Sequence, residues 1–249
     1  MNKLLIFGAT GGIGKACISS AIDKGDYRVV CIGNTTEHID KLKEEFRDSC
    51  DYIETNLKKN DSVEEVFLRA CSPRNDEDDI TKVCGVIYSA GIEGVRPLRV
   101  MTTDYFEDVM RINCSTFVQI CKCMSSKKYS MDGASIVAIS SLTAWSLSVG
   151  EGAYGISKAA LNAAVQQASL ELVGRKIRVN AVLPGSTDTE MFAKVRERIP
   201  DIDERLTIEQ PLGLIDPKQV ARMIDFLLSD DSIYITGACI PISGGRKYF

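Results

Sequence analysis

Near its start the chain reads Lys3-Leu4-Leu5-Ile6-Phe7-Gly8-Ala9-Thr10-Gly11-Gly12-Ile13-Gly14, an apolar run followed at once by a glycine-rich turn. The run is typical of a short strand, and residues 12–24 are predicted to form a helix. A strand, a glycine turn and a helix in this order let the backbone approach a pyrophosphate, whose oxygens would face the free N–H groups of the first helical turn. The spacing is G-x-x-x-G-x-G instead of G-x-G-x-x-G, so the turn alone does not establish nucleotide binding.

Strand and helix candidates alternate along the rest of the chain. Six further apolar runs are predicted strands: 28–32, 51–54, 83–88, 134–140, 177–183 and 238–242. Helices are predicted at 37–47, 61–70, 104–124 and 154–173 and after Asp216-Pro217. Several strands are apolar throughout, which indicates a parallel sheet covered on both faces. We therefore expect an α/β fold: a single Rossmann-type, doubly wound domain over residues 1–249, with about seven parallel strands flanked by helices.

Four turns directly follow predicted strands: the glycine turn, Ser89-Ala90-Gly91, Ser141 and Pro184-Gly185. In open parallel sheets, ligands bind beyond the carboxyl ends of the strands, where the strand order switches. We therefore expect these four turns to share one edge of the sheet and to form the functional site there.

The composition argues against several classes of partner. The chain has 249 residues, 45% of them hydrophobic, with a net charge of −4, and its pI near 5.3 offers no electrostatic footprint for nucleic acid or an anionic membrane. The first apolar run is too short for a signal peptide, and no stretch could span a bilayer, so we expect a cytoplasmic protein. The nine cysteines and the single histidine, His38, form no metal-ligand pattern, so we expect reduced thiols and no metal site.

Ser141, Tyr154 and Lys158 are the strongest candidates for chemistry. Tyr154 and Lys158 stand four residues apart, so a helix would place both side chains on one face. A phenol of pKa ~10 is a poor acid or base at neutral pH, and a nearby ammonium would lower that pKa. Ser141 follows a predicted strand and could hydrogen-bond the oxygen on which the tyrosine acts. The alternative is that Tyr154 and Lys158 form an ordinary surface pair.

Taken together, these motifs resemble the short-chain dehydrogenase/reductase family over essentially the whole chain. Gly8, Gly12 and Gly14 match its TGxxxGxG cofactor turn, although Phe7 replaces the threonine. Ser89-Ala90-Gly91 matches most of its NNAG motif, with Tyr88 in place of the first asparagine. The family's later strand and cofactor loop correspond to Arg178-Val179-Asn180-Ala181-Val182-Leu183-Pro184-Gly185, and its catalytic tetrad corresponds to Asn113, Ser141, Tyr154 and Lys158.

The resemblance implies hydride transfer between a nicotinamide and a carbonyl carbon, with Tyr154 passing the proton and Ser141 polarising the substrate oxygen. Lys158 would hold the nicotinamide ribose and lower the pKa of Tyr154, and Asn113 would anchor a water that links Lys158 to solvent. Thr189 could touch the nicotinamide carboxamide, although a helix N-cap is an equal use for it. The implied cofactor contacts are Gly8, Thr10, Gly11, Gly12, Ile13, Gly14, Gly33, Asn34, Thr35, Asn56, Leu57, Ser89, Ala90, Gly91, Tyr154, Lys158, Pro184, Gly185, Thr187 and Thr189.

Cofactor choice is predicted from the end of the second strand, where an acidic residue would bind the ribose 2′-OH and repel a 2′-phosphate. The chain has Gly33-Asn34-Thr35 there and no acid. Asn34 and Thr35 could donate hydrogen bonds to a phosphate, and Gly33 would leave room for it. Against this, no arginine is present, and Gly11 stands where a basic residue often assists. NADP(H) is favoured, with NAD(H) as the alternative.

The compact length and the stretch Gln210-Pro211-Leu212-Gly213 resemble 3-oxoacyl-[acyl-carrier-protein] reductases within the family. Reductases of sugars, steroids and small alcohols share this layout, so the substrate is a small carbonyl or alcohol compound or an acyl thioester. Two other classes stay open: a catalytically silent nucleotide-binding regulator or scaffold, which would not need an intact tetrad, and a structural protein without cofactor, which would leave the glycine turn unexplained. Substrate identity, direction and stereochemistry are not determined by the sequence.

Two expectations concern mobility and assembly. Residues 186–215 lack steady periodicity and contain Pro200, Pro211 and Gly213, so they are predicted to form a mobile substrate lid. The last strand lies at one edge of the sheet, and exposed edges are commonly covered by a partner. The family resemblance accordingly implies a homotetramer, or a homodimer.

Overall fold

The computed structural model describes residues 2–59, 62–73, 82–93, 96–147 and 149–247. Within these ranges seven strands form one parallel sheet in the order β3-β2-β1-β4-β5-β6-β7. The strands are β1 (Asn2–Phe7), β2 (Tyr27–Gly33), β3 (Cys50–Glu54), β4 (Val83–Tyr88), β5 (Ser130–Ile139), β6 (Arg178–Pro184) and β7 (Cys239–Ile242). The order reverses between β1 and β4, so the carboxyl ends of these two strands define the switch point where such sheets bind ligands.

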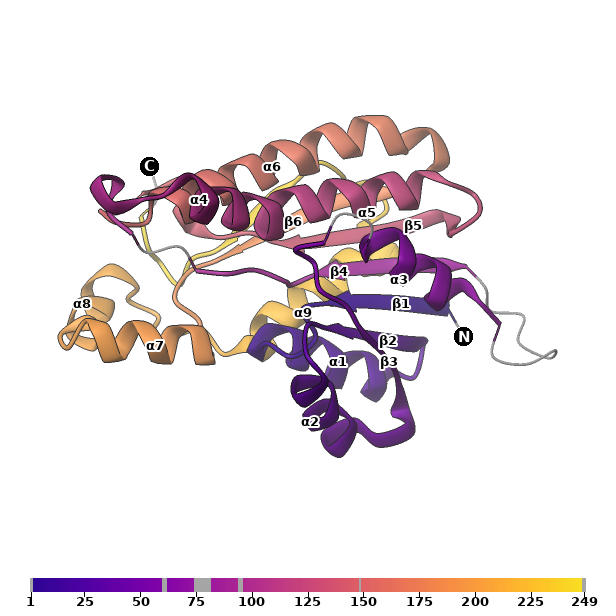
Figure 1. Ribbon diagram of the computed structural model, residues 1–249, viewed down its shortest axis with the longest axis horizontal. Coiled ribbons are helices and arrows are strands. Elements are labelled where there is room, and N and C mark those ends of the chain that lie inside the picture. Colours follow the sequence, from indigo (N-terminus) through magenta and orange to yellow (C-terminus); the bar gives the residue numbers. More distant parts are fainter. Residues whose placement is uncertain (1, 60–61, 74–81, 94–95, 148, 248–249) are drawn as a thin grey trace.

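Helices cover both faces of this sheet (Figure 1). One face carries α3 (Ser62–Cys71), α4 (Thr103–Met110), α5 (Thr116–Ser125) and α6 (Gly152–Leu172), and the other carries α1 (Gly12–Lys24), α2 (Thr36–Phe46) and α9 (Pro217–Leu228). The expected doubly wound α/β fold is therefore confirmed. Among the described residues no helix is both long and apolar enough to cross a membrane.

Side chains of β1 show how the two cores form. Leu5 and Phe7 pack with residues of α3, α5 and α6, whereas Leu4 and Ile6 pack with residues of α1, α2 and α9. All four are fully buried, because successive side chains of a strand point to opposite faces and both faces are covered. Burying a side chain of this size contributes about 1.5–3 kcal/mol, which is why the strands are apolar throughout instead of alternating.

The long helix expected at 104–124 is interrupted. α4 ends at Met110, a π-helical turn spans Arg111–Ser115, and α5 begins at Thr116. The turn widens the backbone at Asn113, whose amide bonds to the backbone of Ile92, and the buried hydroxyl of Tyr88 donates to the carbonyl of Ile112. These contacts tie the π-helical turn to the end of β4 and to the loop after it. The apolar pattern of the sequence does not reveal such a bulge, and bulges of this kind are frequent at functional sites.

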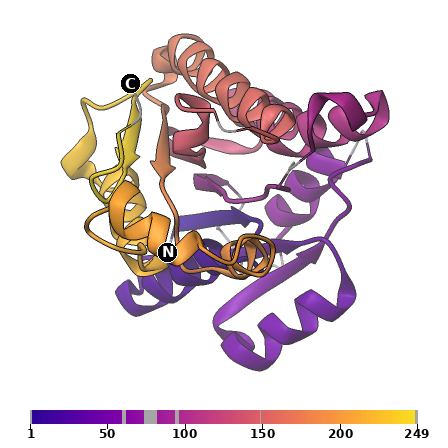
Figure 2. The ribbon, with the colours of Figure 1, turned by 90° about the vertical axis from the view of Figure 1, so that its left-hand side faces the viewer.

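Residues 186–215 form two short helices, α7 (Glu190–Arg198) and α8 (Ile202–Glu209), where the sequence predicted no regular structure. They project beyond the carboxyl ends of the strands, on the left of Figure 1 and toward the viewer in Figure 2. Helix α7 begins at Thr189, whose hydroxyl accepts a hydrogen bond from the backbone N–H of Phe192. The N-cap alternative for Thr189 is thus the one adopted in this structure.

Candidate active site

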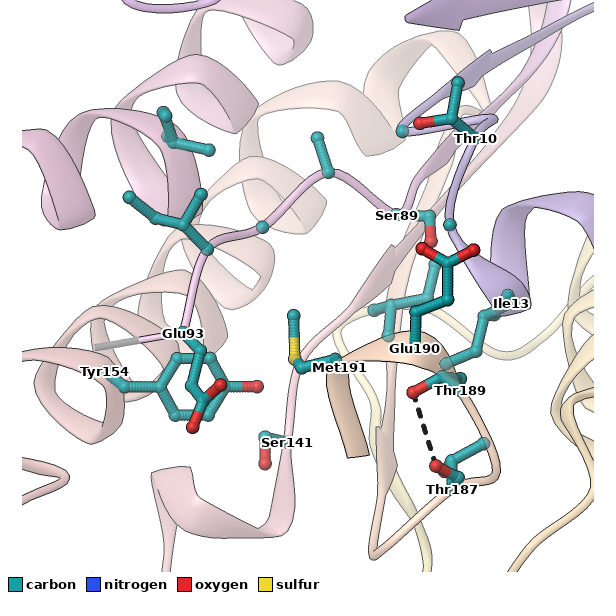
Figure 3. A pocket seen from close by; sticks show the side chains of 18 of the residues that line it. Thr10, Ile13, Ser89, Glu93, Ser141, Tyr154, Thr187, Thr189, Glu190 and Met191 are labelled. Atoms are coloured by element: carbon teal, nitrogen blue, oxygen red, sulfur yellow. Dashed lines mark hydrogen bonds between the residues drawn. The ribbon is translucent and has the colours of Figure 1, made fainter. Parts of the chain in front are cut away.

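A cavity of about 730 Å³ lies at the carboxyl ends of the strands and brings together nearly all the residues predicted from the sequence. Its lining includes the glycine turn, the loop after β4, the predicted catalytic residues Ser141 and Tyr154, and the loop after β6. The predicted residues in its lining are Gly8, Thr10, Gly11, Gly12, Ile13, Gly33, Asn34, Asn56, Leu57, Ser89, Ala90, Gly91, Ser141, Tyr154, Lys158, Pro184, Gly185, Thr187 and Thr189. In Figure 3, Thr10, Ile13 and Ser89 lie at one end and Tyr154, Ser141 and Glu93 at the other.

At three of its glycines, Gly8, Gly12 and Gly14, the glycine turn packs too closely against its surroundings for a Cβ to fit without a shift. Gly8 has a φ of +76°, and a Cβ there would lie 2.4 Å from the backbone nitrogen of Ala90. A Cβ on Gly14 would lie 2.3 Å from the carbonyl oxygen of Gly8, and one on Gly12 would lie 2.8 Å from Cγ2 of Thr189. These glycines let the β4 loop, helix α1 and the start of the lid meet around one cradle.

The cradle opens onto the N-terminus of α1. Gly11 precedes this helix and has no side chain that could accept a hydrogen bond from the N–H groups of the first turn. Such a helix N-terminus favours a phosphate through its N–H donors and its dipole. The donor set and the space beside it fit the pyrophosphate of a dinucleotide.

Three predicted site residues lie outside the lining of the cavity. Gly14 serves the close packing of α1 on the turn. Thr35 is the N-cap of α2, its hydroxyl accepting from the backbone N–H of His38 at 3.3 Å. Asn113 is fully buried behind the wall, where its Oδ1 accepts from the N–H of Ile92 at 2.8 Å and its Nδ2 donates to the Ser157 hydroxyl at 2.9 Å.

Helix α6 positions the two central groups. Tyr154 and Lys158 stand one turn apart on the same face, with Lys158 Nζ 5.7 Å from the centre of the Tyr154 ring. The ammonium donates to the carbonyl of Ile139, at the end of β5, at 2.9 Å. Ser141 begins the short helical turn Leu142–Ala144, and its oxygen accepts from the Thr143 N–H at 3.1 Å. The surface-pair alternative is excluded, because Lys158 is only 4% exposed.

The proton chemistry of the pair differs from the expectation. Burial raises the pKa of Tyr154 to about 12; the Ser141 hydroxyl opposes this shift, and the carboxylates of Glu151 and Glu93 add to it. Burial also lowers the pKa of Lys158 to about 8. Lys158 is not among the groups that shift the pKa of Tyr154 here; its ammonium is itself desolvated and donates to the Ile139 carbonyl. The lowering of the Tyr154 pKa by Lys158 stays a prediction.

Asn113 and Lys158 lie close together on either side of Gly91. A Cβ on Gly91 would lie 3.4 Å from both Asn113 Oδ1 and Lys158 Nζ. The amide of Asn113 bonds to the backbone N–H and carbonyl of Ile92, so it fixes the loop after β4. Its predicted role as the anchor of a water stays a prediction.

Comparisons with known proteins agree with this site. Residues 8–247 match the family model described as enoyl-(acyl carrier protein) reductase. The chain is 30% identical to a 3-oxoacyl-[acyl-carrier-protein] reductase of Thermotoga maritima over 245 residues, which cover 97% of this chain and 96% of that protein. The chain belongs to the short-chain dehydrogenase/reductase family. It is an oxidoreductase of that family, as its resemblance predicted.

Two further relatives of this short-chain dehydrogenase/reductase are named as reductases of carbonyl compounds. Carbonyl reductase family member 4 of Xenopus tropicalis is 29% identical over 97% of this chain and 96% of its own length. The solved structure of an actinorhodin polyketide ketoreductase with NADPH has a TM-score of 0.86 at 24% identity, covering 98% of this chain and 96% of that one. This last likeness shows the shared fold.

The departures of this dehydrogenase/reductase from its family motifs have packing reasons. Tyr88 packs against Phe7 at a ring-centroid distance of 6.3 Å and against Phe117 at 5.8 Å. Phe7 continues the row to Phe67 at 6.4 Å. The two substitutions, Phe7 and Tyr88, therefore belong to one buried aromatic row, and aromatic pairs at these distances add about 0.5–1.5 kcal/mol beyond their burial.

Gly33 does not provide the open space that the sequence predicted. A Cβ at this position would lie 2.9 Å from Ile39 Cδ1 and 3.1 Å from Thr10 Cγ2. The glycine thus allows α2 and the glycine turn to approach the end of β2. Asn34 is the neighbouring residue in the cavity lining, and its Oδ1 lies 3.1 Å from Nδ1 of His38.

The sequence reasoning missed one histidine and several charged residues that line the cavity: His38, Lys58, Glu93, Glu151, Glu190, Lys194 and Arg198. Glu93 follows the Ser89-Ala90-Gly91 motif by two residues, which was a usable signal. Arg198 reaches the site only because α7 folds back over it, and its guanidinium lies 3.3 Å from the Glu93 carboxylate. No local pattern in the sequence connects these two residues.

The two ends of the predicted lid, residues 186–215, are held together by hydrogen bonds. Thr187 and Ile215 form a parallel β-bridge, and Asp188 N–H donates to the Ile215 carbonyl at 2.9 Å. Gln210 is fully buried; its Oε1 accepts from the Ser186 N–H at 2.9 Å, and its Nε2 donates to the Ser186 carbonyl at 2.9 Å. Any motion of the lid is therefore confined to the residues between these anchors.

Amide hydrogen exchange is expected to be fast in α7 and α8 without ligand and slower with cofactor and substrate. The reason is that each helix buries one side chain, Phe192 in α7 and Leu206 in α8. The amides of Asp188 and Ile215, which bond between the two ends of the lid, should stay protected in both states. Strong and equal protection of α7 and α8 with and without ligand would contradict the prediction of a mobile lid and would show that both helices are fixed.

Proposed function

We propose that this short-chain dehydrogenase/reductase reduces a carbonyl group with NADPH, and that Tyr154 donates the proton. The observation that carries the proposal is that the Tyr154 phenol and the glycine cradle open into the same cavity. With a pKa of about 12, Tyr154 carries its proton at neutral pH. The raised pKa also makes it a weaker acid than a free phenol, so the Ser141 hydroxyl, which lowers this pKa, would assist the transfer to a substrate oxygen.

The other residues of the tetrad receive separate roles. Ser141 would donate a hydrogen bond to the substrate carbonyl oxygen, since its hydroxyl lines the cavity at the same end as Tyr154. Lys158, charged below a pKa of about 8, would hold the nicotinamide ribose and supply a replacement proton. Asn113 positions the loop that carries Gly91 beside Lys158. The bound nicotinamide would supply the hydride.

The residues present fit a nicotinamide dinucleotide. The tight cradle of Gly8, Gly12 and Gly14 and the uncapped N-terminus of α1 would receive the pyrophosphate. The end of β2 would receive the adenosine ribose. Asn34 and His38 line the cavity there, and neither is an acid that would repel a 2′-phosphate. We therefore favour NADP(H) over NAD(H).

A 3-oxoacyl thioester is the proposed substrate class. Its support is the 30% identity over nearly the whole chain to a protein named 3-oxoacyl-[acyl-carrier-protein] reductase, together with the carbonyl reductase among the relatives. The regulator alternative is less favoured, because a protein without turnover has no need to bring Ser141, Tyr154 and Lys158 into one cavity.

NADPH oxidation, followed by absorbance, is expected with neutral 3-oxoacyl thioesters in a panel that also contains sugars, steroid ketones and small ketones. A thioester should give the highest kcat/KM of the panel. Tight NADPH binding without turnover of any compound would contradict the proposed function and favour the regulator. Fastest turnover of a sugar or a steroid would keep the reductase and replace the substrate class.

We also propose that copies of the chain associate into a homotetramer, or a homodimer. β7 is the last strand at one edge of the sheet, and each of its residues is partly exposed. Ile233 and Tyr234, just before this strand, are 53% and 94% exposed. A partner covering this edge would bury these side chains and pair the free strand edge.

A further inference from the structure

The substrate end of the cavity contains an ion pair between two distant parts of the chain. Glu93, in the loop after β4, and Arg198, the last residue of α7, both line the cavity, and their carboxylate and guanidinium lie 3.3 Å apart. Figure 3 shows Glu93 at the Tyr154 end of the cavity, with Ser141. The pair therefore stands where the part of the substrate next to the reacting carbonyl has to fit.

The two partners are not equivalent. The Glu93 side chain is 17% exposed and the Arg198 side chain is 57% exposed, so the carboxylate lies inside while the guanidinium extends toward solvent. The Glu93 carboxylate also acts on the Tyr154 phenol, because Glu93 and Glu151 both add to the burial that raises the pKa of Tyr154. Two carboxylates therefore act on the reacting end of the cavity beside the Lys158 ammonium, which lies 5.7 Å from the centre of the Tyr154 ring. Lys194 and Arg198 line the cavity from α7.

We propose that Glu93 is a specificity-determining residue that excludes carbonyl compounds bearing a carboxylate close to the carbonyl and admits the neutral ester or thioester of the same acid. This inference rests on the proposed carbonyl reductase function. A substrate carboxylate beside Tyr154 would share that end of the cavity with the Glu93 carboxylate, which is only 17% exposed, and like charges repel more strongly where water is partly excluded. A thioester in the same position carries no charge and meets no such repulsion.

Two substrates and three variants test this. The substrates are acetoacetate and the N-acetylcysteamine thioester of acetoacetate, which share the reacting ketone and differ in the charge beside it. The variants are Glu93→Gln, Arg198→Gln and Glu197→Gln. Glu197 is exposed on the same helix and does not line the cavity, so its variant is the matched control. The readout is the ratio of kcat/KM for acetoacetate to kcat/KM for the thioester, which cancels changes common to both.

Glu93→Gln is expected to raise this ratio about tenfold, because it removes the repelling charge and keeps the shape of the side chain. Arg198→Gln should lower the ratio, because it removes a positive charge and leaves the Glu93 carboxylate unpaired. Glu197→Gln should match the wild type. Selection by charge thus requires that the Glu93 and Arg198 substitutions change the kcat/KM ratio in opposite directions.

A purely mechanical role of the pair, as a latch for the lid, would give another result. Breaking either side of a latch has the same consequence, so both variants would change kcat/KM for the two substrates in parallel and leave the ratio alone. That outcome, or an unchanged ratio in Glu93→Gln, overturns the inference while the reductase function stands. A wild type that reduces neither compound, nor any other in the carbonyl panel, overturns the proposed function and the inference with it.

Discussion

Replacing Tyr154 with phenylalanine is expected to lower kcat by a factor of ~10²–10⁴, the usual range for loss of a general acid. The ring stays in place, so packing around α6 is kept, and only the hydroxyl that donates the proton is lost. Affinity for NADPH should change little, because Thr10 and Ile13 of the glycine turn lie at the other end of the cavity in Figure 3, and Gly33 at the end of β2 lies beside Thr10. Steady-state kinetics and NADPH fluorescence titration measure the two effects separately.

Tyr234→Phe is the matched control for this variant. Tyr234 lies outside the cavity lining, at the edge of the sheet proposed above for subunit association, and keeps its ring in Tyr234→Phe. Loss of its hydroxyl alone should therefore leave kcat unchanged. A folded Tyr154→Phe protein with the wild-type rate would end the proposed mechanism. A Tyr154→Phe protein that loses both turnover and NADPH binding would show that the hydroxyl acts on the structure of the site and not on the proton.

Asn34→Asp is expected to reverse or erase the preference for NADPH. The ratio of kcat/KM with NADPH to kcat/KM with NADH should fall by a factor of roughly ten to one hundred. Two unit charges ~4 Å apart at an effective dielectric of ~20 repel by ~4 kcal/mol before relaxation and salt, and a 2′-phosphate would stand beside the new carboxylate. Asn and Asp have the same shape, so the contact of Asn34 with His38 keeps its geometry. Gly33 is unsuitable for this test, because a Cβ there would lie 2.9 Å from Ile39.

Asn2→Asp adds the same charge at the opposite end of the sheet and should leave the cofactor preference unaltered. Kinetics with both cofactors at equal ionic strength make the comparison. A wild type that already prefers NADH would show that a missing acid at the end of β2 was a poor guide. In that case Asn34 would bind the ribose hydroxyls itself.

Much of the architecture was determined by the local sequence. Apolar runs such as Leu4 to Phe7 exclude alternation of polar and apolar side chains, and a sheet with both faces covered is the arrangement that buries them. A glycine turn after the first run and Ser141 after the fifth then had to share the carboxyl edge of a parallel sheet. The positions of Tyr154 and Lys158 on one face followed from helical geometry alone.

The tertiary structure decided where these side chains point and which charges they meet. Gly33 faces Ile39 and Thr10, and Glu93 meets Arg198 from a helix 105 residues away. Periodicity reports which residues are apolar, but it carries no information about contacts between distant segments. The pKa of Tyr154 is the clearest case: spacing predicted a downward shift from Lys158, whereas burial and two carboxylates raise it, because the cost of desolvating a charge depends on everything packed around it.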